Sequence, residues 1–447
     1  GAQPTHRKRQ RLESILDEGV HLMDYSGLFS SNMPLPVEMP VGLQADTKYV
    51  FSVTYADKGV FPTEGLIESL SKVIRNEGTT LSQYPPPQGH LGMRELIAGT
   101  LATQRGAPTN PESIFLSSGA GGAIGAILDV FIDPGDVVFL EEFSYLGTLK
   151  MLLERGADVR HVPTDENGMD TDALDRMIGE AIAEGAKPKM IYTISVYQNP
   201  MGVTLSYDRR RHMVEIAQKH GVPIFENESY ADFRIDGDPL PPAMLGMDDT
   251  DSVMYVSAYT KLMGCGLRLG YGVVPDPVKE SLQKIRFGGA PSHLAAMGVY
   301  QYLTDNREEY ITDVASSLRD SRDAMLGALD RHFPSNTSWS KPDGGMMLWV
   351  ELPEGADTLA ALPAAVEADV NGIFSATPAP GPIRLLIGSQ GLVLVQSCIA
   401  WQLPTVPAVV RILGAVIAVI AIAALISAAI GEARENRAPY WRRRHGR

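Results

Sequence analysis

The stretch that decides the fold is Val256-Ser257-Ala258-Tyr259-Thr260-Lys261, followed by Gly266-Leu267-Arg268-Leu269-Gly270-Tyr271. A lysine just after an apolar strand stands where a sheet ends and ligands bind. Desolvation there would lower the pKa of its amine, as a Schiff-base amine requires. We expect Arg268, seven residues later, to open the next strand, where it can clamp a phosphate. Taken alone, such a lysine is more often a surface residue, so the interpretation depends on the other motifs.

Short apolar runs alternate with helical periodicity from about residue 60 onward. Because the runs are continuous rather than alternating, we expect strands buried on both faces, in a mostly parallel sheet covered by helices. The predicted helices cover 64–76 and 93–105, with long charged helices over about 276–333, and 339–353 has strand character and begins a smaller domain. The predicted strands are 113–116, 137–140, 159–162, 190–195, 223–226, 252–256 and 267–274.

The composition describes a globular chain. It has 447 residues, 44% of them hydrophobic and 21% charged, with a net charge of −14. The acidic balance argues against broad binding to nucleic acid. The two cysteines, Cys265 and Cys398, exclude a disulfide framework and a cysteine-based zinc site, and the histidines lack ligand spacing, so we expect no metal.

A glycine-rich turn, Ser117-Ser118-Gly119-Ala120-Gly121-Gly122, lies between a predicted strand and a predicted helix. Its backbone N–H groups would point at an anion at the positive end of the helix dipole, which makes a good but nonspecific phosphate site. A dinucleotide interpretation is an alternative, because Glu141 ends the next strand. The third glycine, Gly125, stands one position late for that motif.

Two further strand ends carry polar side chains. One is Tyr197-Gln198-Asn199-Pro200, and the other is Phe225-Glu226-Asn227-Glu228-Ser229-Tyr230. Both should lie at the carboxyl edge of the sheet. Tyr145 could stack on a planar ring.

With these motifs the chain resembles the class I/II aminotransferases, pyridoxal-phosphate enzymes of fold type I. It looks closest to the branch acting on aminoadipate, kynurenine or aromatic amino acids. The resemblance covers about residues 60–365. The motifs that carry it are Tyr84, Gly89-His90-Leu91-Gly92-Met93-Arg94-Glu95-Leu96, the turn at 119–122, Pro134-Gly135-Asp136, Asn199-Pro200-x-Gly202, Tyr230, Lys261, Arg268 and Gly344-Gly345-Met346-Met347-Leu348-Trp349.

The resemblance implies a role for each matching position. Lys261 would form the Schiff base with pyridoxal 5'-phosphate and move the proton during catalysis. The phosphate would be held by Arg268, Thr260 and the N–H groups of Ala120 and Gly121. The pyridine ring would contact Tyr145, Asn199, Asn227 and Tyr230. Tyr84 would reach the phosphate of the other subunit, which implies a homodimer with shared active sites.

The chain departs from the family pattern at important positions. Asn227 stands where the family has Asp facing the pyridine nitrogen, and an amide carries no charge to keep that nitrogen protonated as the electron sink. Glu226 and Glu228 point to the opposite face of an extended strand, so neither replaces it easily. Ala258 occupies a position that is usually Ser, and Ala120 with Gly121 replaces a polar pair, which leaves the phosphate to backbone amides.

The C-terminal region differs in composition from the rest of the chain. Arg384 lies about where the family has its arginine for the substrate carboxylate, but somewhat early, and an incidental Arg in a foreign tail is the alternative. No Asp or Glu occurs between Asn371 and Gly431, and residues 412–430 carry no charge. At 1.5 Å rise per residue this run is long enough for a transmembrane helix. The arginines after it would be held in the cytoplasm by the positive-inside rule, which would place the large domain outside. A reading-frame shift or a fusion would also explain the tail.

The predicted organisation is an N-terminal arm (1–50), a cofactor-binding large domain (51–290), a smaller α+β domain (291–385) and a divergent tail (386–447) with a hydrophobic helix. The predicted function is transfer of an amino group from an amino acid to a 2-oxo acid, with no nucleic-acid partner. We expect a cytoplasmic catalytic domain with 412–430 as a candidate membrane anchor. The alternatives are a pyridoxal-phosphate-binding relic or sensor, impaired by Asn227, and a dinucleotide-binding oxidoreductase.

Overall fold

The computed structural model describes residues 54–55, 57–285 and 290–351, with Met23, Tyr25, 27–29 and the strand segments 49–50, 370–371, 376–377, 384–388 and 391–397. Residues 1–36 and 37–447 form separate units. In the first unit, the amide of Leu28 donates to the carbonyl of Tyr25 in a turn. The predicted membrane segment 412–430 lies outside the described residues. Within the described part of the chain, no helix is long and apolar enough to cross a membrane.

A seven-stranded sheet forms the centre of the second unit. Its neighbouring strands run parallel except β10, which pairs antiparallel with both β2 and β9. The predicted mostly parallel sheet is therefore confirmed. In spatial order the strands are β2 (Ile114–Ser117), β10 (Gly270–Val273), β9 (Val253–Ala258), β8 (Ile224–Asn227), β7 (Pro188–Ile194), β3 (Val137–Glu141) and β4 (Asp158–Val162).

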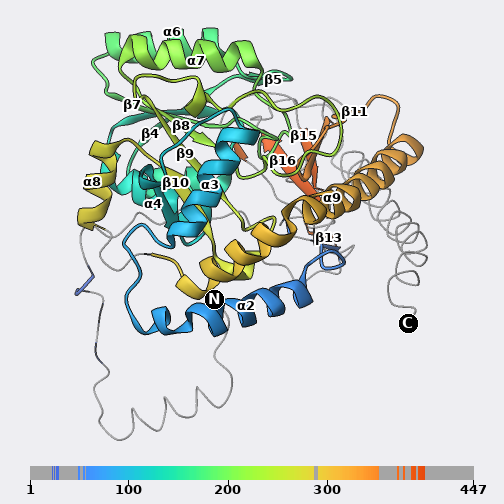
Figure 1. Cartoon of the computed structure of the whole chain (residues 1–447). Helices are drawn as coiled ribbons and strands as arrows, with labels where there is room; N and C mark the ends of the chain where they lie inside the picture. The colour runs from blue at the N-terminus through green and yellow to red at the C-terminus, as the bar shows by residue number, and fades with distance from the viewer. Residues whose placement is uncertain are drawn as a thin grey trace, which may run out of the picture. The chain divides into compact units, whose positions relative to one another are not determined.

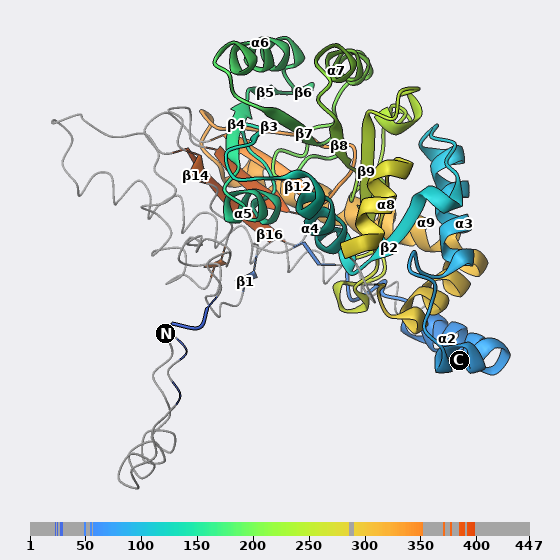
Figure 2. The same ribbon diagram turned by 90° about the vertical axis from the view of Figure 1, so that its left-hand side faces the viewer.

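Helices cover both faces of this sheet, with α6 and α7 on one face and α4, α5 and α8 on the other (Figure 2). Helix α9 packs against α2 and α3 (Figure 1). The helices are α2 (Thr63–Glu77), α3 (Leu91–Gln104), α4 (Gly119–Phe131), α5 (Leu146–Glu154), α6 (Thr171–Ala183), α7 (Tyr207–His220), α8 (Asp276–Ile285) and α9 (His293–His332). Short 3-10 turns span Gly78–Ser82, Pro111–Ser113, Met244–Gly246 and Cys265–Leu267.

The side chains of each strand alternate between two hydrophobic cores. Leu140 and Phe225 pack in the core on the α4 side, whereas Phe139 and Ile224 pack with the helices α6 and α7. This alternation follows from the period of two along a strand, and burial on both faces explains why the strands read as continuous apolar runs. It also fixes which way each residue at a strand end points.

A smaller five-stranded sheet follows α9. Its spatial order is β11 (Ser338–Trp339), β12 (Met347–Glu351), β15 (Arg384–Gly388), β16 (Gly391–Ser397) and β14 (Ala376–Thr377). Two small pairs complete the described strands: β1 (Tyr49–Val50) with β13 (Val370–Asn371), and β5 (Thr164–Asp165) with β6 (Gly168–Met169). The domain boundaries expected at residues 50, 290 and 385 stay predictions.

The structure corrects one expected boundary. Arg268 was expected to open a strand over 267–274, but β10 begins only at Gly270. The reason is local: Cys265–Leu267 forms a 3-10 turn and Arg268 adopts a left-handed conformation with φ of 50°. Such a residue cannot continue an extended strand. The bend directs Arg268 toward the start of α4.

Candidate active site

Lys261 follows the end of β9 by three residues, as the sequence predicts. Its amine is partly buried and donates to the backbone carbonyl of Thr54 at 2.8 Å. Burial lowers the pKa of this amine, and the nearby guanidinium of Arg268 lowers it further. The amine is thus held inside the protein, in a setting that favours its neutral, nucleophilic form.

The glycine turn and Arg268 lie against each other. Nη2 of Arg268 donates to the carbonyl of Ser118 at 2.9 Å. The packing requires glycine, because a Cβ on Gly119 would come within 2.7 Å of that same Nη2, and one on Gly270 within 2.5 Å of the Gly119 carbonyl carbon. No side chain caps the start of α4, and nothing lies within 4 Å of a Cβ built on Gly121. The helix N-terminus therefore faces open space beside a guanidinium, which suits an anion.

Thr260 presents a buried hydroxyl. Its Oγ1 has no hydrogen-bond partner among the described residues. Burying a hydroxyl without a partner is unfavourable, so such an atom calls for an explanation. A ligand oxygen beside Lys261 would supply the missing partner, and we take this orphaned atom as the sharpest sign that the site is built for a bound group.

Asn199, Tyr230 and Tyr145 come from three different strand ends. Nδ2 of Asn199 donates to the hydroxyl of Tyr230 at 3.4 Å, and Thr54 also hydrogen-bonds this hydroxyl. Tyr145 stands at the start of α5, where burial and the neighbouring Tyr230 raise the pKa of its phenol against the effect of Arg268. Thr54 thus contacts both Lys261 and Tyr230, and Tyr145 lies near Tyr230 and Arg268.

Asn227, the last residue of β8, is 4% exposed. Its Nδ2 donates to the hydroxyl of Tyr192 at 2.8 Å. Its Oδ1 accepts from the amide and the hydroxyl of Ser229, at 3.1 and 2.7 Å. Asn227 belongs to the same strand face as Phe225, on the α4 side.

The neighbouring glutamates occupy the opposite face, as expected for an extended strand. Both are fully buried and bind guanidinium groups: Glu226 binds Arg210 at 3.2 Å, and Glu228 binds Arg210 at 3.0 Å and Arg105 at 2.7 Å. Burial and the charge of Glu228 raise the pKa of Glu226 to about 7. Burial alone would raise the pKa of Glu228 as well, but Arg105 and Arg210 hold it at about 2. Neither carboxylate is free to serve a ligand on the other face.

Sequence reasoning missed this buried network and Thr54. One signal was available for Arg210, which stands on the apolar face of α7 with Met213, Val214 and Ala217. A charged residue on such a face needs a buried partner. Nothing in the sequence singles out Thr54, which reaches Lys261 through a backbone carbonyl from 207 residues away.

Two predicted site residues have no contact with this cluster among the described residues. Tyr84 is 99% exposed after the turn that follows α2. Arg384 begins β15, opposite Glu351 of β12 in the strand register, and its side chain lies outside the described residues.

Glu141, the acidic residue of the dinucleotide alternative, is 1% exposed. Its carboxylate accepts from the hydroxyl of Thr193, the amide of Ile194 and the hydroxyl of Ser144. It is therefore unavailable to a ribose, and the structure gives the dinucleotide interpretation no support.

Comparison with known proteins places the chain in a family. The model for "Aminotransferase class I and II" matches residues 55–371. The chain is 30% identical over 310 residues to aromatic-amino-acid aminotransferase 1 of Thermococcus litoralis, covering 68% of this chain and 74% of that one. It is 28% identical to the 2-aminoadipate transaminase of Thermus thermophilus over 66% of this chain and 73% of the relative.

The fold agrees. An archaeal alanine:glyoxylate aminotransferase superposes with a TM-score of 0.72 at 27% identity, covering 83% of this chain and 95% of that structure. The family match, the relatives and the fold lead to one conclusion. This chain belongs to the class I and II aminotransferases, and the cofactor of that family is pyridoxal 5'-phosphate.

Proposed function

We propose that this aminotransferase moves an amino group from an amino acid to a 2-oxo acid, with Lys261 as the amine that bonds to the cofactor aldehyde. The observation that carries the proposal is the setting of this amine. It is desolvated and held by Thr54, and it lies beside Arg268, whose guanidinium contacts the glycine turn.

The residues present fit pyridoxal phosphate. Arg268, the unpartnered hydroxyl of Thr260 and the N–H groups of Ala120 and Gly121 would hold its phosphate. Tyr145 offers an aromatic ring that would stack on the pyridine ring, and Asn199 with Tyr230 would hydrogen-bond the 3′-oxygen attached to that ring. When bound, this group supplies electron withdrawal from the bonds around the α-carbon of the amino acid.

The role of Lys261 follows from its surroundings. With the cofactor and an amino acid bound, Nζ of Lys261 would act as general base and acid, accepting the proton from the α-carbon and donating it to C4′ of the cofactor. Burial lowers the pKa of this amine, which favours the neutral form that a proton acceptor requires. The hydrogen bond to the carbonyl of Thr54 holds the amine at the sheet edge, where it is partly buried.

The exposed apolar surface around α2 supports a homodimer. Tyr84 is 99% exposed, and Ile67, Ile74 and Leu91 are each about half exposed, at 52%, 48% and 48%. We infer that a second copy of the chain covers these side chains and that Tyr84 reaches the site of that copy. Arg384, the first residue of β15, stays our candidate for binding the substrate carboxylate.

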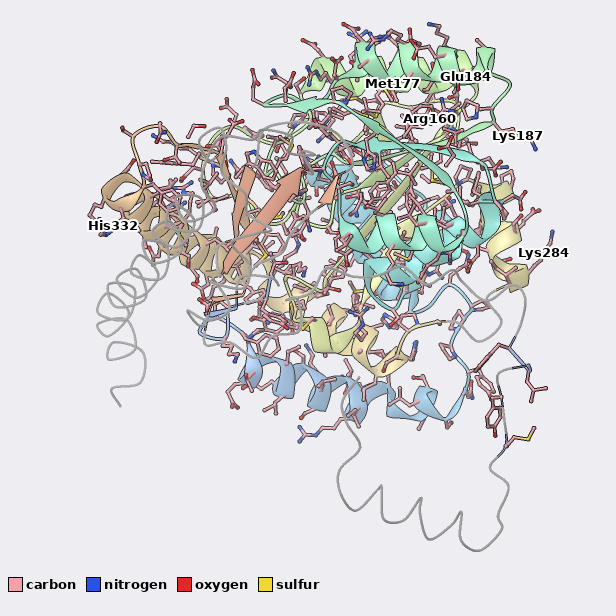
Figure 3. All side chains as sticks on the ribbon, turned by 180° about the vertical axis from the view of Figure 1, so that it is seen from behind. Arg160, Met177, Glu184, Lys187, Lys284 and His332 are labelled. Atoms are coloured by element: carbon pink, nitrogen blue, oxygen red, sulfur yellow. The ribbon has the colours of Figure 1, made fainter. Side chains whose placement is uncertain are left out.

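The test compares two lysine variants loaded with pyridoxal phosphate. Lys187 is exposed and projects from the surface just before the amino end of β7, whereas the site lies at carboxyl ends of strands, so Lys187→Ala is the control (Figure 3). We expect Lys261→Ala to lose both the lysine-linked absorbance band and transamination, and Lys187→Ala to keep them. If Lys261→Ala retains the band, the proposal is wrong. A cofactor-binding relic or sensor without turnover would show the band but no spectral change with any amino acid.

A further inference from the structure

The side chain of Asn227 has a fixed orientation. The backbone N–H of Ser229 is only a donor, so the atom of Asn227 that faces it must be the carbonyl oxygen. A flipped amide would place two donor groups against each other at 3.1 Å. The identity of each end of the amide therefore follows from chemistry.

The acceptor capacity of this amide is already used. Oδ1 has two lone pairs, and Ser229 occupies both, one through its amide and one through its hydroxyl at 2.7 Å. Asn227 has no lone pair left for another donor.

One donor remains. Nδ2 carries two hydrogens, and one of them goes to the hydroxyl of Tyr192 at 2.8 Å. Thr148 contacts the same hydroxyl at 3.0 Å, and both Tyr192 and Thr148 are buried, which holds the acceptor in place. Toward an incoming ligand, Asn227 can only donate.

We propose that Asn227 holds the ring nitrogen of bound pyridoxal phosphate in its unprotonated form, by donating its remaining amide hydrogen to that nitrogen. The proposal rests on the function proposed above and on the family resemblance, which implies that Asn227 faces the ring nitrogen. A protonated nitrogen would carry an N–H that finds no acceptor on Asn227, and its positive charge would be buried without a counterion.

In the described part of the chain, the carboxylates of Glu226, Glu228 and Glu141 are not available as that counterion. Glu226 and Glu228 lie on the opposite face of the sheet and are bound to Arg210 and Arg105. The oxygens of Glu141 are taken by Thr193, Ile194 and Ser144. Among the described residues, the neighbours of Asn227 therefore favour an unprotonated ring nitrogen.

The state of the ring nitrogen can be read directly. The full-length protein is loaded with pyridoxal phosphate carrying ¹⁵N in the ring, and the ¹⁵N chemical shift is compared with free cofactor in its protonated and unprotonated forms. We expect the bound resonance at the unprotonated position at every pH at which the protein stays folded. A resonance at the protonated position overturns the proposal, whether or not any variant folds.

Two variants sharpen the result. Asn227→Asp supplies a carboxylate oxygen that can accept from a protonated nitrogen, so its resonance should move to the protonated position. Asn167→Asp makes the same chemical change at an exposed residue and should leave the resonance unchanged. An unmoved resonance in Asn227→Asp contradicts the proposal.

Failure of this inference differs from failure of the proposed function. Borohydride reduction of the same sample attaches the cofactor to the lysine it is bonded to. A label on Lys261 with a protonated ring overturns only the role of Asn227. A label elsewhere overturns both.

Discussion

Arg210 is the best place to test how the site is supported, because its guanidinium joins β8, which ends at Asn227, to the segment after β7 that leads to Asn199. The group is fully buried and makes five hydrogen bonds. They go to Glu226, to Glu228 and to the carbonyls of Leu205, Ser195 and Pro242. The perturbation is Arg210→Met, which keeps an unbranched apolar stem and removes the charge.

We expect Arg210→Met to lower the free energy of unfolding, because Glu226 loses its guanidinium partner. Glu228 would keep Arg105, but Glu226 would retain only the hydroxyl of Ser195 and the amides of Met244 and Leu245. Removing one partner from a buried ion pair costs about 3–5 kcal/mol. At pH 7 we expect the variant to lose about 3 kcal/mol of unfolding free energy, roughly 150-fold in the folding equilibrium. This is the lower end of the range, because Glu226 can bind a proton and so avoid a buried, unpaired charge.

The pH dependence gives a second signature. The pKa of Glu226 is about 7 in the folded protein, so wild type gives up this proton as the pH rises through 7. The variant lacks the guanidinium and keeps the proton, while its unfolded state is ionised. Above pH 7 the deficit of the variant should therefore grow by up to about 1.4 kcal/mol per pH unit.

Urea unfolding measures both effects. Arg211→Met is the matched control, since Arg211 is the next residue on α7 and forms only an exposed pair with Glu215. We expect the control to cost about 0.5 kcal/mol or less. Adding Glu226→Gln to Arg210→Met should restore stability and remove the growth above pH 7. The reasoning is refuted if Arg210→Met is as stable in urea as Arg211→Met. It is also refuted if the difference in unfolding free energy between wild type and Arg210→Met stays constant above pH 7.

Three further changes test other parts of the account. Asn227→Asp should raise turnover about tenfold or more, worth at least about 1.4 kcal/mol of barrier, and unchanged steady-state rates would contradict a weakened electron sink. Gly270→Ala forces a Cβ within 2.5 Å of the Gly119 backbone, so cofactor affinity in an absorbance titration should fall by about 1–3 kcal/mol of strain, whereas Gly179→Ala, with open space around it, should bind normally. The folded pKa of Glu228, about 2, lies below its unfolded value of 4.5, so its stabilising effect is present above pH 4.5 and lost as the pH falls toward 2; Glu228→Gln should flatten acid unfolding curves in that window.

The large sheet could be predicted from sequence because burial on both faces leaves strong apolar runs. Strand β3 was expected at 137–140 and spans Val137–Glu141, and β8 was expected at 223–226 and spans Ile224–Asn227. Strand β10 was predicted too long, because the apolar residues around Arg268 suggest an extended strand while Arg268 itself is left-handed. The pair β5 and β6 was missed, since two-residue strands carry no periodicity.

The candidate site was predictable where it depends on strand ends. Lys261, Asn199 and Tyr230 follow strands whose carboxyl ends meet at one edge of the sheet. Arg268 precedes β10, which runs antiparallel to β9 and therefore begins at that same edge. The ionic network was not predictable, because Arg105 finds Glu228 across 123 residues and no local pattern encodes that pairing. The orientation of the Asn227 amide also required coordinates, since it depends on which atoms face Ser229 and Tyr192.

The central claim concerns one amine, and one measurement tests it most directly. The purified protein is reconstituted with pyridoxal phosphate, reduced with borohydride, digested and mapped by mass spectrometry. The account predicts a single phosphopyridoxyl adduct, on the peptide that contains Lys261. An adduct on any other lysine, or none, would contradict it.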